Sequence, residues 1–368
     1  MDVNLRLHRK NSYSIAALAP LLPRATLVSE PRDGIMVYSF PTRQKDMFFA
    51  EVDNSNTDSI YIAGGPHPSG TPAETLEHFD YVVIGEGEET LPELIEAVQL
   101  CTDTDQIRGI AYRQKGNIIY TDPRPHVNLD RYPCFDPEGI HSPMEISRGC
   151  PYRCKYCQTP YLFGHRMRHR SIDSIVRCAQ HYRDLRFTSS NAFAYGSDGV
   201  HPRLDKVEKL LSTLCQLEDK NIYFGTFPSE VRPEFVTDQA LELVVEYCTN
   251  STISLGAQSG SDRVLERIRR GHTVRDVTTA IERCSAHGIT PTVDFIFGFP
   301  DETEEEQLHT LEQIKWIIKN NGHVRAHYLT PLPSTPYANV VPAKVCDRVR
   351  RVLGAMARDG KLTGTWED

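Results

Sequence analysis

The sequence predicts an α/β protein of two domains, a doubly wound sheet followed by a partial barrel of six strand–helix units. In both halves of the chain, short apolar runs alternate with helical patterns, which is typical of mostly parallel sheets. A Pro-rich stretch at 122–143 separates the two halves. Because six units fall short of the eight units and about 250 residues of a complete barrel, we expect an open, partial (β/α)6 TIM-type barrel.

The first domain is expected to contain five strands and four helices. The strands are predicted at 3–8, 25–29, 35–40, 59–65 and 81–87, and the helices at 14–22, 44–52, 71–79 and 88–100. Four glycines fall at the carboxyl ends of these strands: Gly64, Gly65, Gly85 and Gly87. Doubly wound sheets bind their ligands at those ends, so the glycines mark a candidate binding edge.

The remaining elements set the domain boundaries. A hairpin is predicted at 107–121, with its turn at Lys115 and Gly116. In the second domain, strands are predicted at 144–147, 185–190, 221–227, 252–258, 290–299 and 323–332, and Thr303 with Glu306 forms a capping box. We therefore divide the chain into a first domain (1–105), a hairpin and linker (106–143), the barrel (144–337), and a C-terminal helix and tail (338–368).

Composition narrows the classes of protein that the chain can belong to. A net charge of −8 argues against a general nucleic-acid binder, because such proteins carry excess Lys and Arg. The basic cluster at 165–170 is read as a solvated face, with steering of an anionic substrate as the alternative. No apolar run approaches the roughly 20 residues of a membrane span. The N-terminus is charged where a signal peptide is apolar, so we expect a cytoplasmic protein.

Three of the ten cysteines stand close together, at Cys150, Cys154 and Cys157, directly after the first barrel strand. Loops at the carboxyl ends of barrel strands hold the chemistry of such folds. Three thiolates suit an iron–sulfur cluster, and a four-iron cluster on three cysteines leaves one iron open. Zinc is an alternative, but it needs a fourth ligand, for which His165 or Cys134 would have to serve. A plain electron-transfer cluster is the other alternative.

The cysteine segment, CPYRCKYC, resembles the Cys-x3-Cys-x-aromatic-Cys signature of the radical S-adenosylmethionine (SAM) superfamily, with Tyr156 at the aromatic position. Segments 256–273, 288–303 and 329–337 resemble the fourth, fifth and sixth strand segments of the same family. Two positions depart from its pattern, Gln258 where many members have Glu and Asp301 where Gly is usual. The resemblance implies a [4Fe–4S] cluster on the three cysteines, with SAM on the open iron and its reductive cleavage to a 5′-deoxyadenosyl radical.

The resemblance also implies which residues contact SAM. Cys150, Cys154, Cys157 and Tyr156 are the expected catalytic set, and the three cysteines are the metal ligands. The expected SAM contacts are Ser189, Ser190, Asn191, Gln258, Ser259, Arg269, Phe297 and Leu329, with Arg269 opposite the carboxylate. For each of these residues the alternative is packing at a strand end or, for Ser259, a helix cap.

The first domain resembles the Rossmann-like cobalamin-binding domain that precedes many radical SAM enzymes, through GGPHPSGTPAETL and VVIGEGEETLPELIEAV. The implied cobalamin contacts are Ser39, Thr42, Gln44, Gly64, Gly65, His67, Gly85, Glu86 and Gly87. His67 is the candidate that approaches cobalt, and a surface histidine is the alternative. The sequence lacks the Asp-x-His-x-x-Gly motif whose histidine ligates cobalt in many such domains.

The whole pattern resembles a class B radical SAM methyltransferase of a small archaeal type, an oxygen-sensitive enzyme that works anaerobically. It implies methylcobalamin-dependent transfer of a methyl group to an unactivated carbon, with Cα of a glutamine in methyl-coenzyme M reductase as the predicted substrate. The alternatives are a cobalamin-dependent cyclase or rearrangement enzyme and a non-catalytic cluster-binding protein. Methylthiotransferases hold a second cluster on N-terminal cysteines, and residues 1–100 contain no Cys. Expected partners are a protein, peptide or small-molecule substrate and a ferredoxin- or flavodoxin-type electron donor.

Overall fold

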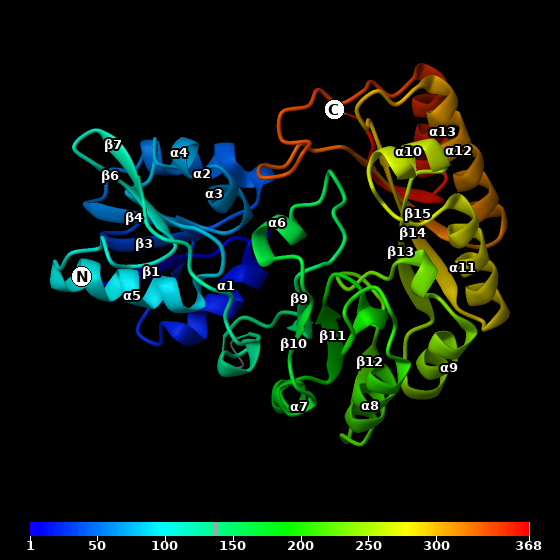
Figure 1. The fold of residues 1–368 in the computed structure, drawn as a ribbon, viewed down its shortest axis with the longest axis horizontal. Helices are drawn as coiled ribbons and strands as arrows, with labels where there is room; N and C mark the ends of the chain where they lie inside the picture. Colours follow the sequence, from blue (N-terminus) through cyan, green and yellow to red (C-terminus); the bar gives the residue numbers. More distant parts are fainter. Residues whose placement is uncertain (136–138, 368) are drawn as a thin grey trace. The chain divides into compact units, whose positions relative to one another are not determined.

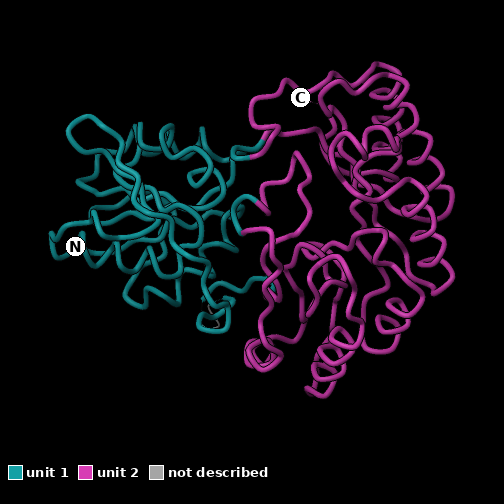
Figure 2. The backbone as a smooth tube through the Cα atoms, in the orientation of Figure 1, with its two compact units in different colours: residues 1–143, 161–163, 332–334 teal, residues 144–160, 164–331, 335–368 magenta. Residues whose placement is uncertain are grey.

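The computed structural model describes residues 1–135 and 139–367, so residues 136–138 of the predicted linker and Asp368 lie outside the described residues. The chain forms two compact units (Figure 2). The first comprises residues 1–143 with 161–163 and 332–334, and the second comprises residues 144–160, 164–331 and 335–368. None of the helices in the described ranges is long and apolar enough to cross a membrane.

The first unit contains one sheet of seven strands in the order β2-β1-β3-β4-β5-β6-β7. The strands are β1 (Val3–Arg6), β2 (Thr26–Val28), β3 (Gly34–Ser39), β4 (Ser59–Gly64), β5 (Tyr81–Val83), β6 (Ile110–Gln114) and β7 (Asn117–Tyr120). Strands β1 to β5 are parallel, and β6 and β7 add the antiparallel hairpin. The order 2-1-3-4-5 is the flavodoxin-like form of a doubly wound sheet. Such sheets bind their ligands at the topological switch point between β1 and β3.

Helices cover both faces of this sheet (Figure 1). They are α1 (Ser12–Leu18), α2 (Lys45–Asp53), α3 (Pro66–Gly70), α4 (Pro72–Thr75) and α5 (Gly87–Leu100). Because side chains alternate along a strand, Ile35 and Val37 of β3 join the core under α1 and α5. Met36 and Tyr38 join the opposite core, under α2.

Most of the predicted elements of this unit are confirmed, with three differences. The strand predicted at 81–87 ends at Val83, and Gly87 is the first residue of α5. The predicted hairpin turns where expected, since Lys115 and Gly116 both have positive φ (50° and 81°), as a two-residue I′ turn requires. The predicted helix at 71–79 ends at Thr75, and α3 was not predicted. Prolines at the first positions of both α3 and α4 divide this segment into two short helices.

The second unit carries parallel strands that follow one another in chain order. The strands β8 (Met144–Glu145), β11 (Asp184–Thr188) and β12 (Asn221–Tyr223) form one sheet, and β13 (Thr252–Gln258), β14 (Thr290–Phe297), β15 (His323–Tyr328) and β16 (Leu362–Thr365) form the next. A parallel bridge from Val231 to Leu255 joins the two sheets into one curved wall. The short strands β9 (Ser147–Arg148) and β10 (Arg168–His169) pair separately.

Helices lie on the outer side of this wall (Figure 1). They are α7 (Ile172–Ala179), α8 (Leu204–Cys215), α9 (Asp238–Tyr247), α11 (Val274–Ala286), α12 (Glu304–Lys319) and α13 (Asp347–Arg358), with the shorter α6 (Thr159–Phe163) and α10 (Asp262–Arg267) in loops. The predicted capping box of Thr303 and Glu306 is confirmed at the start of α12. The strand β16 was not predicted: its Gly364 has a φ of 113°, and a Cβ there would collide with the carbonyl oxygen of Ala326 in β15.

Candidate functional site

The three clustered cysteines line one cavity of about 350 Å³ in the second unit. The loop that carries them is fixed at both ends: the amide of Cys150 donates to the carbonyl of Gly164, and the amide of Lys155 donates to the carbonyl of Ile268. Tyr156 also lines the cavity, and its ring contacts Phe299 with 5.5 Å between centroids. The predicted catalytic set of four residues therefore faces a single space.

Cys154 is buried and Cys150 and Cys157 are partly buried, and this burial raises the pKa of both Cys150 and Cys157. Tetrahedral zinc, with Zn–S bonds of about 2.3 Å, needs its ligand atoms within about 4 Å of one another. No three His, Cys, Asp or Glu side chains among the described residues converge in a way that could hold a single metal ion. Cysteine thiolates are the ligands that hold iron–sulfur clusters, and three of them line this cavity.

Arg270, and not the predicted Arg269, lines this cavity. The Nη1 atom of Arg270 lies 3.9 Å from the Cys154 sulfur, and its Nη2 donates to the carbonyl of Gly256 at 2.9 Å. The reason is local: helix α10 ends at Arg267, and Arg269 adopts a left-handed φ of 56°, which reverses the chain direction. Arg270 is therefore the candidate for pairing with an anionic group beside the cysteines.

Arg232 connects the cysteine loop to the segment that carries Arg270. Its guanidinium stacks on the ring of Tyr152 at 3.4 Å from the centroid, and Nη2 donates to the carbonyl of Arg270 at 2.5 Å. Its Nε donates to Glu234 at 2.6 Å. The side chain is buried, and through these contacts it holds two walls of the cavity together. Arg232 was not among the residues predicted from the sequence.

Among the predicted SAM contacts, Ser189, Ser190 and Gln258 line the cavity. The hydroxyl of Ser190 donates to the carbonyl of Gly149 at 2.7 Å, which joins the end of β11 to the start of the cysteine loop. Gln258 lies at a bulge in β13 with a φ of 72°. Asn191 is buried next to this wall, where its Oδ1 accepts from the amide of Arg232.

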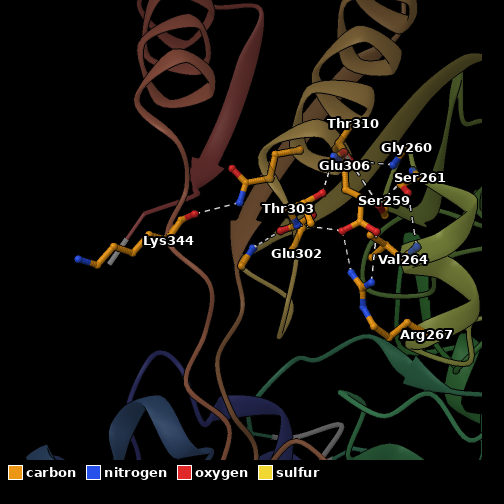
Figure 3. A network of polar contacts seen from close by, with 12 residues as sticks. Ser259, Gly260, Ser261, Val264, Arg267, Glu302, Thr303, Glu306, Thr310 and Lys344 are labelled. Carbon is orange, nitrogen blue, oxygen red and sulfur yellow. Dashed lines mark hydrogen bonds and ion pairs between the residues drawn. The ribbon is translucent and has the colours of Figure 1, made fainter.

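The structure places three other predicted SAM contacts outside the lining of the cavity. The buried hydroxyl of Ser259 contacts Thr310 of α12 at 3.3 Å and accepts from the amide of Ser261 (Figure 3). Leu329 belongs to a buried apolar cluster against which Tyr156 packs, and Phe297 is a fully buried residue of β14. These positions favour packing at a strand end for Leu329 and Phe297. The helix cap predicted as the alternative for Ser259 is wrong, because Ser261 caps α10.

A charged group inside the barrel was not predicted. Glu230, Asp294 and His327 line the cavity, and Arg325 lies behind them. Burial and the neighbouring Asp294 raise the pKa of Glu230 to about 8. Asp294 interrupts an apolar strand, and this interruption is the sequence signal that could have revealed the group.

In the first unit, several predicted cobalamin contacts meet at the carboxyl ends of the strands. Ser39 ends β3, Gly64 ends β4, and Gly85 follows β5. Gly65 has a φ of 90°, and a Cβ there would stand 2.6 Å from the Ser39 hydroxyl and 2.9 Å from the amide nitrogen of Phe40. The edge is therefore built around a backbone position without a side chain, which suits the approach of a large flat ligand.

Most of the polar residues predicted to contact cobalamin at this edge form hydrogen bonds with neighbouring residues. His67 is 2% exposed, with Nδ1 at 3.3 Å from Thr42 and Nε2 at 3.1 Å from Thr71 and 3.4 Å from Glu74. Burial lowers the pKa of His67, so the imidazole is neutral and internally bonded. This geometry argues against His67 as a cobalt ligand, and equally against the alternative of a surface histidine.

Two further candidates of the edge differ in how they are bonded. Glu86 accepts from the amide of Val127 at 2.8 Å, which ties it to the segment after the hairpin. Gln44 contacts Nδ1 of His8 at 2.8 Å through Nε2, but its buried Oε1 has no hydrogen-bond partner among the described residues. A buried acceptor without a donor fits an edge that receives a polar ligand.

Comparison with known protein families assigns a segment of each unit to a family. Residues 144–314 match the radical SAM superfamily, and residues 45–95 match the B12 binding domain. The chain thus contains a radical SAM domain, preceded by a B12-binding domain. The two matches confirm the predicted fold class and the predicted cofactors, cobalamin for the first domain and SAM with a [4Fe–4S] cluster for the second.

The chain is similar to several curated proteins. It is 26% identical over 303 residues to an uncharacterized methyltransferase of Pyrococcus horikoshii, covering 77% of this chain and 63% of the relative. It is 29% identical over 192 residues to a tRNA-2-methylthio-N(6)-dimethylallyladenosine synthase of Fusobacterium nucleatum, covering 49% and 42%. The chain thus spans less than two thirds of the length of either relative.

Two solved structures share its fold. The methyltransferase TsrM from Kitasatospora setae, solved with cobalamin and a [4Fe–4S] cluster, gives a TM-score of 0.70 at 17% identity, covering 92% of this chain and 77% of that chain. The cobalamin-dependent radical enzyme OxsB gives a TM-score of 0.65 at 18% identity, covering 85% and 51%.

Proposed function

We propose that this protein is a cobalamin-dependent radical SAM methyltransferase that transfers a methyl group to an unactivated carbon. The observation that carries the proposal is the cavity shared by Cys150, Cys154 and Cys157, in a chain that also has a B12-binding domain. The similarity to the Pyrococcus horikoshii methyltransferase gives it further support.

The residues of the cavity have distinct roles in this proposal. The three cysteines hold the cluster, and Arg270 places its positive charge beside Cys154, where it balances a thiolate or the SAM carboxylate. Ser190 and Gln258 offer hydrogen bonds to SAM from the ends of neighbouring strands. When bound, these cofactors supply the radical and the methyl group, and the protein supplies binding, orientation and the exclusion of water.

The glycine edge of the first unit is the proposed cobalamin site. Gly64, Gly65, Gly85 and Gly87 let the corrin approach the backbone, and Ser39 and Gln44 offer polar contacts at the same edge. His67 is held by its own neighbours, so we propose that it supports the edge rather than ligating cobalt.

The substrate is a narrower proposal. Cα of a protein glutamine, in methyl-coenzyme M reductase, follows from the resemblance to small archaeal enzymes. A small reducing protein of the ferredoxin or flavodoxin type is the proposed electron donor. The alternative with the same cofactors, a cyclase or rearrangement enzyme, differs in adding no carbon to its substrate.

The test is anaerobic reconstitution with iron, sulfide and cobalamin, followed by incubation with SAM and a chemical reductant. Mass spectrometry then measures 5′-deoxyadenosine and S-adenosylhomocysteine. Formation of both, with loss of 5′-deoxyadenosine in Cys154→Ala but not in the exposed control Cys215→Ala, supports the methyltransferase. 5′-Deoxyadenosine alone favours the rearrangement alternative, and formation of neither product contradicts radical SAM chemistry.

A further inference from the structure

The cysteine loop runs beside the segment that follows helix α10. The amide of Lys155 donates to the carbonyl of Ile268 at 3.0 Å. Three residues earlier in the loop, the ring of Tyr152 lies next to Gly271, where a Cβ would stand 3.5 Å from a ring carbon. Because Gly271 comes three residues after Ile268, the two stretches of backbone lie antiparallel and side by side along this length.

The side chains of these two segments alternate between two sides. Cys154 of the loop lines the cavity, whereas its neighbours Arg153 and Lys155 do not. In the same way, Arg270 lines the cavity and Arg269 does not. Arg153 and Arg269 are exposed, and Lys155 is half-buried. The outer side of the two segments therefore carries three positive charges, which we call the outer basic patch (Arg153, Lys155 and Arg269).

The cations of the outer basic patch are not neutralised by carboxylates. Among the described residues, none of the three side chains forms an ion pair, whereas Arg267 of α10 is paired with Glu306 at 2.9 Å. The Nζ of Lys155 lies 5.8 Å from the centroid of the Tyr337 ring, an interaction that leaves its positive charge in place. Since the chain as a whole has a net charge of −8, unpaired cations grouped at one place give a local positive potential that attracts an anionic partner.

The position of the patch indicates which anionic partner it fits. Its side chains do not line the cavity, so a small molecule there would lack an enclosing pocket. Three cations are also fewer than the roughly 6–10 phosphate contacts of a protein that binds DNA by charge. A folded partner at the patch would lie against the backbone on either side of Cys154, one of the proposed cluster ligands. Electron-transfer complexes match these features, since they have small interfaces and depend on complementary charge.

We propose that the outer basic patch docks an acidic electron-transfer protein, which passes its electron to the cluster beside Cys154. This inference rests on the proposed function, because it names the docking site of the reductant for the same cluster. One electron leaves the donor and enters the cluster, and no atom is transferred in this step. Since the patch and the cavity lie on opposite sides of the loop, the donor does not compete with SAM for space.

The first test measures binding, so it needs no turnover. An oxidised flavodoxin and an oxidised ferredoxin, both of strongly negative net charge, are immobilised, and binding of the cluster-loaded protein is followed anaerobically by biolayer interferometry. At about 0.1 M salt, charges more than about 10 Å apart are screened, so the local charges decide the affinity. The triple variant Arg153→Gln, Lys155→Gln, Arg269→Gln should bind at least one donor about tenfold more weakly than the unchanged protein. At about 1 M salt the two affinities should differ by less than about twofold.

A matched control removes the same number of charges from other surfaces. It combines the exposed Lys209→Gln of α8 with Arg351→Gln and Arg358→Gln of α13. We expect its affinity for the donors to stay within about threefold of that of the unchanged protein. Glu266→Gln, at an exposed acid of α10, tests the sign of the effect and should not weaken binding.

A second measurement separates docking from damage to the cluster, because two of the replaced residues flank Cys154. Iron content is determined for each variant, and stopped-flow absorbance compares reduction of the cluster by the reduced donor with reduction by the methyl viologen radical, a small cation that needs no acidic contact. We expect the triple variant to slow the first reaction about tenfold and not to slow the second. Arg269→Glu, outside the cysteine loop, should weaken donor binding about fivefold even if the triple variant loses iron.

The inference would be overturned by unchanged donor affinity in the patch variants, by an equal loss in the matched control, or by no binding of either donor to the unchanged protein. A protein that binds the donor through the patch but forms no S-adenosylhomocysteine would refute the proposed function alone. Formation of 5′-deoxyadenosine and S-adenosylhomocysteine with a chemical reductant, without donor binding, would refute the docking site alone.

Discussion

The guanidinium of Arg270 bridges Cys154 and Gly256, with Nη1 at 3.9 Å from the sulfur and Nη2 at 2.9 Å from the carbonyl oxygen. Arg269, its neighbour in sequence, does not line the cavity. The two residues therefore offer a matched pair of substitutions at adjacent positions. Any effect confined to one of them reports on the cavity and not on the general charge of the segment.

We expect Arg270→Gln to weaken SAM binding by about tenfold or more, because a charge-assisted hydrogen bond in a shielded site is lost. Arg269→Gln should stay within about twofold of the unchanged protein. Equilibrium dialysis with labelled SAM on the cluster-loaded protein measures both. Equal affinities in the two variants would contradict the assignment of Arg270.

Each cysteine of the loop should be needed for the cluster. We expect Cys150→Ala, Cys154→Ala and Cys157→Ala to lose most of their iron after anaerobic reconstitution, because each removes one of three ligands. Cys215→Ala, at an exposed cysteine of α8, should retain about four irons per chain. Iron and sulfide analysis with electron paramagnetic resonance provides the measurement, and full iron loading in any of the three loop variants would exclude that ligand.

Gly65→Ala should destabilise the first unit by about 2 kcal/mol or more, because the backbone has a positive φ and the new Cβ would collide with Ser39 and Phe40. It should also reduce cobalamin uptake. The control is Gly354→Ala in α13, outside the proposed cobalamin edge, where a new Cβ would meet no atom within 4 Å. Thermal unfolding and the absorbance of bound cobalamin compare the two, and a harmless Gly65→Ala would show that the edge tolerates a side chain.

Glu302 should make stability depend on pH. Burial raises the pKa of Glu302 (Figure 3) from the usual 4.5 to about 7, while its Oε2 accepts from the amide of Gly298 at 2.7 Å. The folded state thus binds the proton more tightly than the unfolded state, so this contribution is complete below pH 4.5 and is lost as pH rises to 7 and above. Glu302→Gln should match the unchanged protein near pH 5 and be roughly 3 kcal/mol more stable at pH 8.

Unfolding in denaturant at pH 5 and pH 8 measures that difference. Glu304→Gln, at an exposed acid in the first turn of α12, is the control and should show no such pH dependence. The prediction would be contradicted if the difference in stability between Glu302→Gln and the unchanged protein were the same at both pH values. Ionisation of the Glu302 carboxyl would then not destabilise the folded state.

The sequence was sufficient for those parts of the fold that rest on local patterns. The alternation of strands and helices, the hairpin turn at Lys115 and Gly116, and the capping box at Thr303 all depend on residues near one another in the chain. The strand β16 could not be predicted in this way. Its pairing with β15 joins residues 324–327 to 362–365, and only a tertiary contact explains why Gly364 is required.

The same division applies to the candidate site. The cysteine spacing predicted one cluster on the three thiols, and the family resemblance named Ser190 and Gln258 as SAM contacts; all five residues line one cavity. The choice between Arg269 and Arg270 depended on one left-handed residue at the end of a helix, which periodicity does not reveal. Glu230 and Arg325 are 95 positions apart, and their encounter follows from the curvature of the sheet.

The pairing of β16 also has a consequence for biosynthesis. Until residues 362–365 have been translated, the side of β15 that they cover presents unpaired amides and carbonyls, a ready template for another strand. The barrel wall therefore stays open to intermolecular pairing during most of its synthesis, and this pairing leads to aggregation. A nascent chain stalled before Leu362 is the form that we expect to depend most on chaperones.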